Sequence, residues 1–147
     1  MNLKQRPPNK HDLATIYQIT LEIQQNPWSQ SEIFSEIEQE NPYSAVIEGE
    51  NGKPIAYFFV RETGPDVEIM LVGVSRSYQR QGIGRHFILD LIKQRVHQGE
   101  IFLEVSDLNW GAIGFYKSLG FKSHGIRRDY YKDGSNAALM KLNLAKP

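Results

Sequence analysis

The sequence contains no cysteine among its 147 residues. This absence excludes disulfide bonds, thiolate metal ligands and a cysteine nucleophile, although it says little about the cellular compartment. A run of about eighteen apolar residues, which a membrane-spanning helix of ordinary length requires, is also missing. The first residues, MNLKQRPPNKHD, have no apolar core of the signal-peptide kind. We therefore expect a soluble cytoplasmic protein.

An excess of charge of either sign is missing as well. The 17 Lys and Arg residues balance 17 Asp and Glu residues, so the composition does not indicate attraction to nucleic acid or to an anionic membrane. We expect neither as a partner. No metal site is expected, because no histidine has the spacing of a metal ligand relative to another histidine or a nearby acid. The four histidines are His11, His86, His97 and His124.

What is present fits one globular domain. Hydrophobic residues make up 40% and charged residues 23%, and the length is that of one ordinary domain, so we predict a single domain over residues 1–147. In the amino-terminal part, helix periodicity and start signals predict a strand over 2–7, a helix from Asn9 to about Asn26, and a second helix from Ser29. The stretch SQSE at the start of the second helix has the spacing of a capping box.

The remainder alternates between β-rich runs and helical patterns. Three β-rich runs separated by the turn-forming stretches GENGK and TGP predict an antiparallel meander. The runs lie at 43–48, 54–62 and 66–74, followed by a helix over about 84–98, a strand over 100–105, a helix over about 109–119, and strands over 121–131 and 137–143. The order β-α-α-β-β-β-α-β-α-β-β predicts an α+β fold with a mixed, mostly antiparallel sheet and helices on both faces.

The stretch YQRQGIGRHF, residues 78–87, joins the third β-rich run to the next helix. It lacks the lysine and Ser/Thr of a nucleoside-triphosphate loop, and Phe87 stands where the dinucleotide fingerprint needs a glycine. Its glycines still allow backbone N–H groups to converge at a helix N-terminus, where an anion is favoured. Positive charge can come from Arg76, Arg80, Arg85 and His86. By itself, the stretch is compatible with an anion site or with a tight turn that has no ligand.

The sequence QRQGIG at 79–84 resembles the Q/R-x-x-G-x-G/A signature of the GNAT acyltransferase superfamily, in which this turn binds the pyrophosphate of coenzyme A. The predicted element order resembles that fold along nearly the whole chain. Within the superfamily the chain is similar to the bacterial ribosomal-protein alanine N-acetyltransferases. This similarity is carried by PWS at 27–29, YQRQGIGR at 78–85, LEVSDLNWGAIGFYKSLGF at 103–121 and IRRDYY at 126–131.

The resemblance implies an acetyl-CoA-dependent N-acetyltransferase whose acceptor is the N-terminal α-amine of a protein, such as a ribosomal protein. In that family a glutamate at the end of the fifth strand is the general base and a tyrosine twelve residues later is the general acid. These positions are Glu104 and Tyr116. The pair suits direct transfer, because an ammonium group must lose a proton before it attacks a thioester and the departing thiolate needs one. Taken singly, Glu104 also fits an ion-paired strand-end carboxylate, and Tyr116 a core aromatic.

The resemblance also assigns the contacts of acetyl-CoA. Backbone N–H groups of the glycine turn would hold the pyrophosphate, with Arg80 and Arg85 as supporting charge. The segment Val72, Gly73 and Val74 would pair with the pantetheine arm like an added strand, and the N–H of Val74 would polarise the thioester carbonyl. Asn109 is expected to cap the following helix and to bond the pantetheine arm. The turn residues assigned are Arg80, Gln81, Gly82, Ile83, Gly84 and Arg85.

The acceptor side is less fully specified. By the resemblance, Trp28, Tyr130 and Tyr131 line the peptide entrance, although packing is an equal alternative for Trp28. No Lys or Arg occurs from His11 to Gly52, whereas eight acids do, which is compatible with an acidic lip for a basic substrate or with a solvated helix face. These acids are Asp12, Glu22, Glu32, Glu36, Glu38, Glu40, Glu48 and Glu50.

Two departures from the family pattern leave the acceptor open. Ser106 replaces a frequent arginine two residues after the base, and Ser135-Asn136 replaces an acidic pair before the last strand. A small amine or a lysine side chain is therefore an alternative acceptor. A catalytically silent acyl-CoA-binding module is a third alternative, against which Glu104 and Tyr116 argue. The oligomeric state is not indicated.

Overall fold

A computed structural model describes residues 3–144. The chain divides into two compact units: a first unit with the residues up to 60 and 71–93, and a second unit with 61–70 and the residues from 94 onward. Strands β3 (Pro54–Thr63) and β4 (Asp66–Val74) run through both. In the described part of the chain, seven strands are hydrogen-bonded in the order β1-β2-β3-β4-β5-β7-β6. No helix among these residues is long and apolar enough to cross a membrane.

The first unit contains the two amino-terminal helices and the glycine turn. Its elements are β1 (Lys4–Arg6), the 3-10 turn η1 (Lys10–Asp12), α1 (Leu13–Ile23), α2 (Gln30–Glu38), β2 (Ala45–Glu48), the 3-10 turn η2 (Arg76–Tyr78) and most of α3 (Ile83–Gln94). Both predicted start signals are confirmed as complete capping boxes, Asn9 with Asp12 and Ser29 with Glu32. The first box caps η1, which leads directly into α1.

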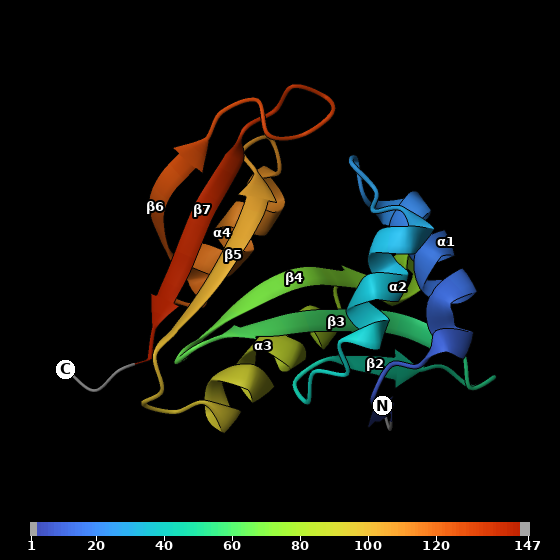
Figure 1. The fold of residues 1–147 in the computed structure, drawn as a ribbon. Coiled ribbons are helices and arrows are strands. Elements are labelled where there is room, and N and C mark those ends of the chain that lie inside the picture. The colour runs from blue at the N-terminus through green and yellow to red at the C-terminus, as the bar shows by residue number, and fades with distance from the viewer. Residues whose placement is uncertain (1–2, 145–147) are drawn as a thin grey trace. The chain divides into compact units, whose positions relative to one another are not determined.

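Helices cover both faces of the sheet in the first unit (Figure 1). Neighbouring strand residues point to opposite faces, and here Tyr57 hydrogen-bonds Thr20 of α1 while Phe58 stacks on Phe87 of α3. Because both faces are covered, the first seven residues of β3 are all buried and show no polar alternation.

The second unit carries the carboxy-terminal strands and α4 (Trp110–Ser118). Strand β5 (Glu100–Ser106) runs parallel to β4 and antiparallel to β7 (Ala137–Asn143). Strand β6 (Lys122–Arg127) pairs antiparallel with β7, is exposed at all six residues and has a register shift between Ser123 and Gly125. Along β5, Ile101 and Leu103 are buried, whereas Phe102 and Glu104 are half-buried on the other face.

The observed ends of one helix and one strand fall short of the sequence predictions. The helix predicted over 84–98 ends at Gln94, and the chain then turns through left-handed backbone at His97 and Gly99. The strand predicted over 121–131 ends at Arg127, because the chain reverses at Asp129, whose φ is 50°. The two tyrosines that follow therefore lie in a loop. Trp110, the first residue of α4, is 80% exposed.

Candidate active site

Glu104 lies near the carboxyl end of β5, where its carboxylate has a cationic partner. The Nε atom of Arg127 is 3.0 Å from Glu104 Oε1. The Arg127 side chain is 58% exposed and that of Glu104 is 20% exposed, so the guanidinium reaches the carboxylate from the solvent side. An ion pair with so exposed a cation contributes at most about 1 kcal/mol, and another cation can displace it at little cost.

Tyr130 and Tyr131 approach the same carboxylate from the loop that follows β6. Burial, the charge of Glu104 and a hydrogen bond to Glu104 raise the pKa of Tyr130. Burial and the charge of Glu104 raise the pKa of Tyr131 to about 12. The two rings meet edge to face at 5.0 Å, and the Arg127 guanidinium lies 5.8 Å from the Tyr130 ring centroid. Glu104 is thus bordered by one arginine and two neutral phenols.

Tyr116 lies on α4 in the same unit and is buried. Its ring packs edge to face against Phe115 and Phe121, with centroids at 5.3 and 5.6 Å. Burial raises the pKa of Tyr116 to about 12, so the hydroxyl keeps its proton at neutral pH. Within residues 3–144, no group hydrogen-bonds this hydroxyl.

The glycine turn has the backbone geometry of an anion cradle. Gly82 has a φ of 82° with open space where a Cβ would stand, and Arg80 is left-handed at 64°. The first bond into α3 runs from the His86 N–H to the Gly82 carbonyl at 2.9 Å. The N–H groups of residues 83–85 precede this bond and find no acceptor in the described part of the chain. Arg80 and Arg85 are exposed beside them.

The entry to the turn is fastened to α1, a contact that the sequence did not reveal. The backbone N–H of Arg76 donates to Glu22 Oε1 at 3.0 Å, and Arg76 Nη2 donates to the Glu22 carbonyl at 2.6 Å. Gln79 Nε2 donates to the Val74 carbonyl at 3.0 Å. The partners Glu22 and Arg76 are 54 residues apart, so no local pattern announces the contact.

Gly73 lies in β4 where a larger side chain would meet its neighbours. A Cβ on Gly73 would lie 2.4 Å from the Tyr57 ring and 2.9 Å from Ile23. Tyr57 is fully buried and its hydroxyl bonds Thr20 at 2.8 Å, so the ring cannot move away easily. A larger residue at the centre of the segment Val72 to Val74 would therefore disturb its packing against Tyr57.

The capping prediction for Asn109 is confirmed. Its side-chain Oδ1 accepts the Ala112 N–H at 3.1 Å at the start of α4. Asn109 belongs to the second unit with Glu104, Tyr116 and the two tyrosines, and of these the structure brings Glu104, Tyr130 and Tyr131 together. The first unit holds the glycine turn, the Val72–Val74 segment and Trp28, which is half-buried between α1 and α2.

Comparison with known proteins identifies the family. A family model described as "Acetyltransferase (GNAT) family" matches residues 13–121. The chain belongs to this family. It is 33% identical over 133 residues to the ribosomal protein bS18-alanine N-acetyltransferase of Escherichia coli (strain K12), with 88% of each chain covered.

Solved GNAT structures confirm the predicted fold. The crystal structure of the ribosomal-protein-S18-alanine N-acetyltransferase from Escherichia coli matches with a TM-score of 0.84 and 28% identity over 99% of this chain and 96% of that chain. Arabidopsis thaliana NAA60 in complex with acetyl-CoA matches with a TM-score of 0.81 and 18% identity over 97% and 99%, a likeness of fold. The chain is thus a GNAT N-acetyltransferase, as predicted.

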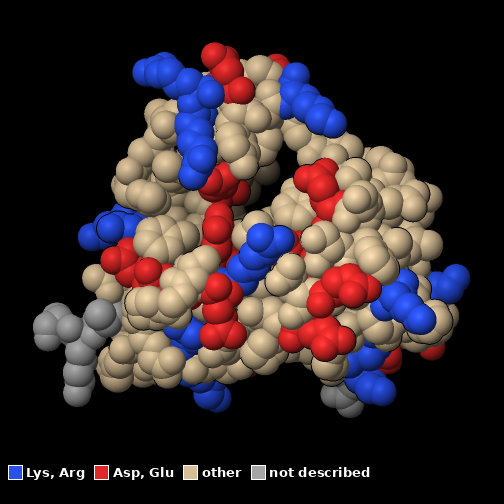
Figure 2. Space-filling view, in the orientation of Figure 1, with Lys and Arg blue, Asp and Glu red and all other residues tan. Residues whose placement is uncertain are grey.

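Most acids of the expected lip have structural roles in this GNAT chain. Asp12 and Glu48 both pair with Arg6, Glu22 holds the entry to the glycine turn, and Glu32 caps α2. Glu36 is buried. Figure 2 shows acidic side chains over α2 and the segment after it. The acids that remain exposed without such a role are Glu38, Glu40 and Glu50.

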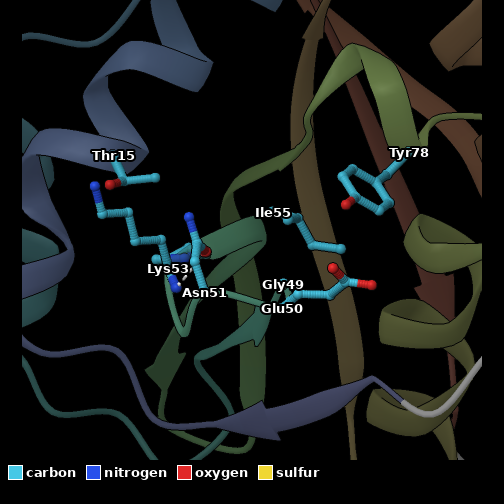
Figure 3. A pocket seen from close by; sticks show the side chains of 8 residues that line it. Thr15, Gly49, Glu50, Asn51, Lys53, Ile55 and Tyr78 are labelled. Carbon is cyan, nitrogen blue, oxygen red and sulfur yellow. Dashed lines mark hydrogen bonds between the residues drawn. The ribbon is translucent and has the colours of Figure 1, made fainter.

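A hollow of about 420 Å³ lies in the first unit but contains none of the predicted site residues. Figure 3 shows Thr15 and Lys53 on one side of it and Tyr78 and Ile55 on the other. Among residues 3–144, no group of three or more metal-ligating side chains occurs. The candidate catalytic residues of this GNAT therefore lie outside the hollow.

Proposed function

We propose that the chain transfers the acetyl group of acetyl-CoA to the N-terminal α-amine of a protein, with a ribosomal protein as the first acceptor to test. The observation that carries this proposal is that one unit contains both a carboxylate with an exposed ion-pair partner, Glu104, and a buried, protonated phenol, Tyr116. The named activity of the Escherichia coli relative supports the acceptor class. The single-domain organisation and the cytoplasmic location stay predictions.

The glycine turn fits the pyrophosphate of acetyl-CoA. The N–H groups of residues 83–85 lie at a helix N-terminus, which favours an anion, and Arg80 and Arg85 add charge. Acetyl-CoA supplies the acetyl group as a thioester. The backbone of Val72, Gly73 and Val74 would align the pantetheine arm, the N–H of Val74 would polarise the thioester carbonyl, and Asn109 would bond the same arm.

Glu104 would accept the proton that the acceptor ammonium must lose. Its carboxylate is held by the exposed Arg127, whose position on Oε1 is one that an ammonium can take. Once the amine is neutral it attacks the thioester carbon, forming the C–N bond as the C–S bond breaks. The nitrogen then loses a second proton as the amide forms, which balances the proton that the departing thiolate takes up. No side chain carries the acetyl group, in keeping with a sequence without cysteine.

Tyr116 would give its proton to the departing thiolate. A phenol with a pKa of about 12 is fully protonated at neutral pH, and its hydroxyl has no competing partner within the described residues. The Tyr130 and Tyr131 rings beside Glu104 would border the acceptor's first residues, and Trp28 is the further aromatic proposed for the peptide entrance.

The test is an acetylation assay with acetyl-CoA and peptide libraries that vary the first residues, run beside polyamines, aminoglycosides and lysine peptides. We expect peptides with a free α-amine to be preferred in kcat/KM, and the same peptides with a blocked amine to be inert. A small amine used better by orders of magnitude would replace the proposed acceptor. The reason to test small amines is that Ser106 and Ser135-Asn136 depart from the pattern that the family resemblance leads us to expect.

A further inference from the structure

The loop between β6 and β7, residues 128–136, is a compact structure that we call the tyrosine loop. It contains Tyr130 and Tyr131 and turns through left-handed backbone at Asp129, with φ 50°, and at Gly134, with φ 84°. The Tyr131 N–H donates to the Ser135 carbonyl at 3.1 Å, and the Gly134 N–H donates to the Tyr131 carbonyl at 2.9 Å. Its backbone bonds therefore close the loop on itself.

Asn136 ties this loop to the end of β5. Its Nδ2 donates to Asp107 Oδ2 at 3.0 Å, and its Oδ1 accepts the Asp129 N–H at 2.9 Å. Its carbonyl accepts the Asp107 N–H at 2.9 Å. One residue thus connects the segment after Glu104 with the strained residue immediately before Tyr130.

A second chain of bonds runs beside the first. Ser106 Oγ donates to Ser135 Oγ at 3.0 Å, and Ser135 Oγ donates to Asp133 Oδ1 at 2.6 Å. Ser135 is only 7% exposed, so these bonds are largely shielded from water. Ser106 lies two residues after Glu104 on β5 and accepts the Leu108 N–H at 3.3 Å.

The two departures from the family pattern are therefore in contact with each other. A neutral hydrogen bond joins Ser106 to Ser135, whereas Asn136 donates to the carboxylate of Asp107. Both positions thus fasten the loop to the end of β5.

We propose that Asn136 and Asp107, supported by Ser106 and Ser135, are positioning residues that hold the tyrosine loop against Glu104. The inference rests on the proposed function, because it assigns the loop to the acceptor. Tyr130 hydrogen-bonds Glu104 and meets Tyr131 edge to face only while the loop keeps this shape, and within the described residues the Asn136 side chain bridges Asp107 and Asp129. Loss of the bridge should therefore lower kcat/KM for the acceptor and leave KM for acetyl-CoA nearly unchanged.

A charge swap tests the bridge. Asn136→Asp removes the donor and places two carboxylates where a 3.0 Å bond now stands, so the loop should be displaced. We expect kcat/KM for the peptide acceptor to fall about 10- to 100-fold, the effect of a misplacement near 1 Å, with KM for acetyl-CoA within about twofold. Asp107→Asn combined with Asn136→Asp restores an amide–carboxylate pair with the roles exchanged and should recover activity to within about threefold.

The matched control is Ser123→Asp, which adds the same charge on the exposed strand β6, opposite Met140. This variant should leave both kcat/KM for the peptide acceptor and KM for acetyl-CoA unchanged. Asn136→Ala, which removes the bond without adding repulsion, should lower acceptor kcat/KM about threefold to tenfold and serves if Asn136→Asp does not fold. A swap that fails to restore activity, or a parallel rise in KM for acetyl-CoA, would overturn the proposal.

Amide hydrogen exchange separates this proposal from the proposed function. The Asp129 and Asp107 amides, both bonded to Asn136, should lose protection in Asn136→Asp and regain it in the swap, whatever the acceptor is. If the wild-type protein acetylates no peptide but shows this exchange pattern, the proposed function fails and the bridge stands. If peptides are acetylated and the protection does not change, the bridge fails alone.

Discussion

At the scale of single residues, the proposed site combines one carboxylate and one phenol in contrasting surroundings. Glu104 is accessible from solvent and paired with an exposed arginine, whereas Tyr116 is 6% exposed and packed between aromatic rings. The first environment keeps a carboxylate able to exchange partners, and the second keeps a phenol protonated. These are the states that a base and an acid need before the reaction starts.

Replacement of Glu104 by Gln should lower kcat about 10²- to 10⁴-fold, because the amide cannot accept the ammonium proton. KM for acetyl-CoA should change little. Steady-state kinetics with a peptide acceptor measure both constants. Glu100→Gln, on the same face of β5 and paired with Lys141, is the control and should retain activity. Wild-type kcat in the Glu104→Gln protein would refute the base assignment.

The raised pKa of Tyr116 predicts a loss of stability at alkaline pH. The pKa is about 12 in the folded chain and 10.0 for an ordinary tyrosine, so folding favours the neutral phenol. This stabilisation is complete below pH 10 and is lost as the pH rises toward 12, up to about 3 kcal/mol. Urea unfolding across this range should show a shallower decline for Tyr116→Phe than for the wild type.

Tyr57 has a pKa raised to about 12 by burial and is present in both proteins, so the difference between their slopes isolates Tyr116. Equal slopes would mean that the phenol of Tyr116 is not buried in solution. That result would also remove the reason to expect it to stay protonated.

At the scale of elements, the packing of β4 against its neighbours sets the shape of the segment Val72–Val74, which is proposed to align the pantetheine arm. Gly73→Ala should destabilise the protein by about 1 to 3 kcal/mol, because the added methyl meets the buried Tyr57 ring at 2.4 Å. Thermal or urea unfolding measures this cost. In a Tyr57→Leu background the same substitution should cost less, whereas in Tyr57→Phe it should not, since the ring carbon Cζ remains at 2.4 Å.

Gly114→Ala is the matched control, because no atom lies within 4 Å of its added Cβ and the residue is inside α4. That substitution should be neutral or stabilise by up to about 1 kcal/mol through helix propensity. Equal destabilisation at both glycines would show that the contact with Tyr57 is not the cause.

Elements that depend on local signals were predictable from the sequence. The two capping boxes, the Asn109 cap and the bounds of β7 at 137–143 all follow from residues within one turn or one strand. The predicted end of β6 was wrong because the observed end depends on the hydrogen bond from the Asp129 N–H to Asn136 Oδ1, which no sequence periodicity indicates. Glycine at position 73 likewise makes sense only beside Tyr57, which lies on another strand.

At the scale of the whole molecule, the charge composition does not show which acids already have ion-pair partners in the fold. Arg6 holds Asp12 and Glu48, and the second of these is 42 residues away, so an acidic stretch in the sequence is partly neutral in the fold. Sequence reasoning could count the acids but could not see their partners. The acidic lip is thereby reduced to Glu38 at the end of α2, Glu40 just after it, and Glu50 in the turn between β2 and β3.

We therefore expect a weak response to salt. KM for a basic peptide should change by no more than about threefold between low and physiological ionic strength, since few exposed charges remain to be screened. Charge reversal at Glu38 and Glu40, both exposed, should have an effect of similar size. Kinetics at several salt concentrations provide the measurement, and a change of more than tenfold would restore the acidic lip as a substrate-binding surface.

Strand β6 has a consequence for solubility. It is the last strand in the sheet order and is exposed at every residue, so one row of its backbone groups faces no partner strand in the described chain. Such an edge invites pairing between molecules. Here charged residues, Lys122 and Arg127, mark its two ends, and the shift between Ser123 and Gly125 breaks its regularity. The irregular strand that leads to the tyrosine loop should therefore also disfavour edge-to-edge pairing of molecules at high protein concentration.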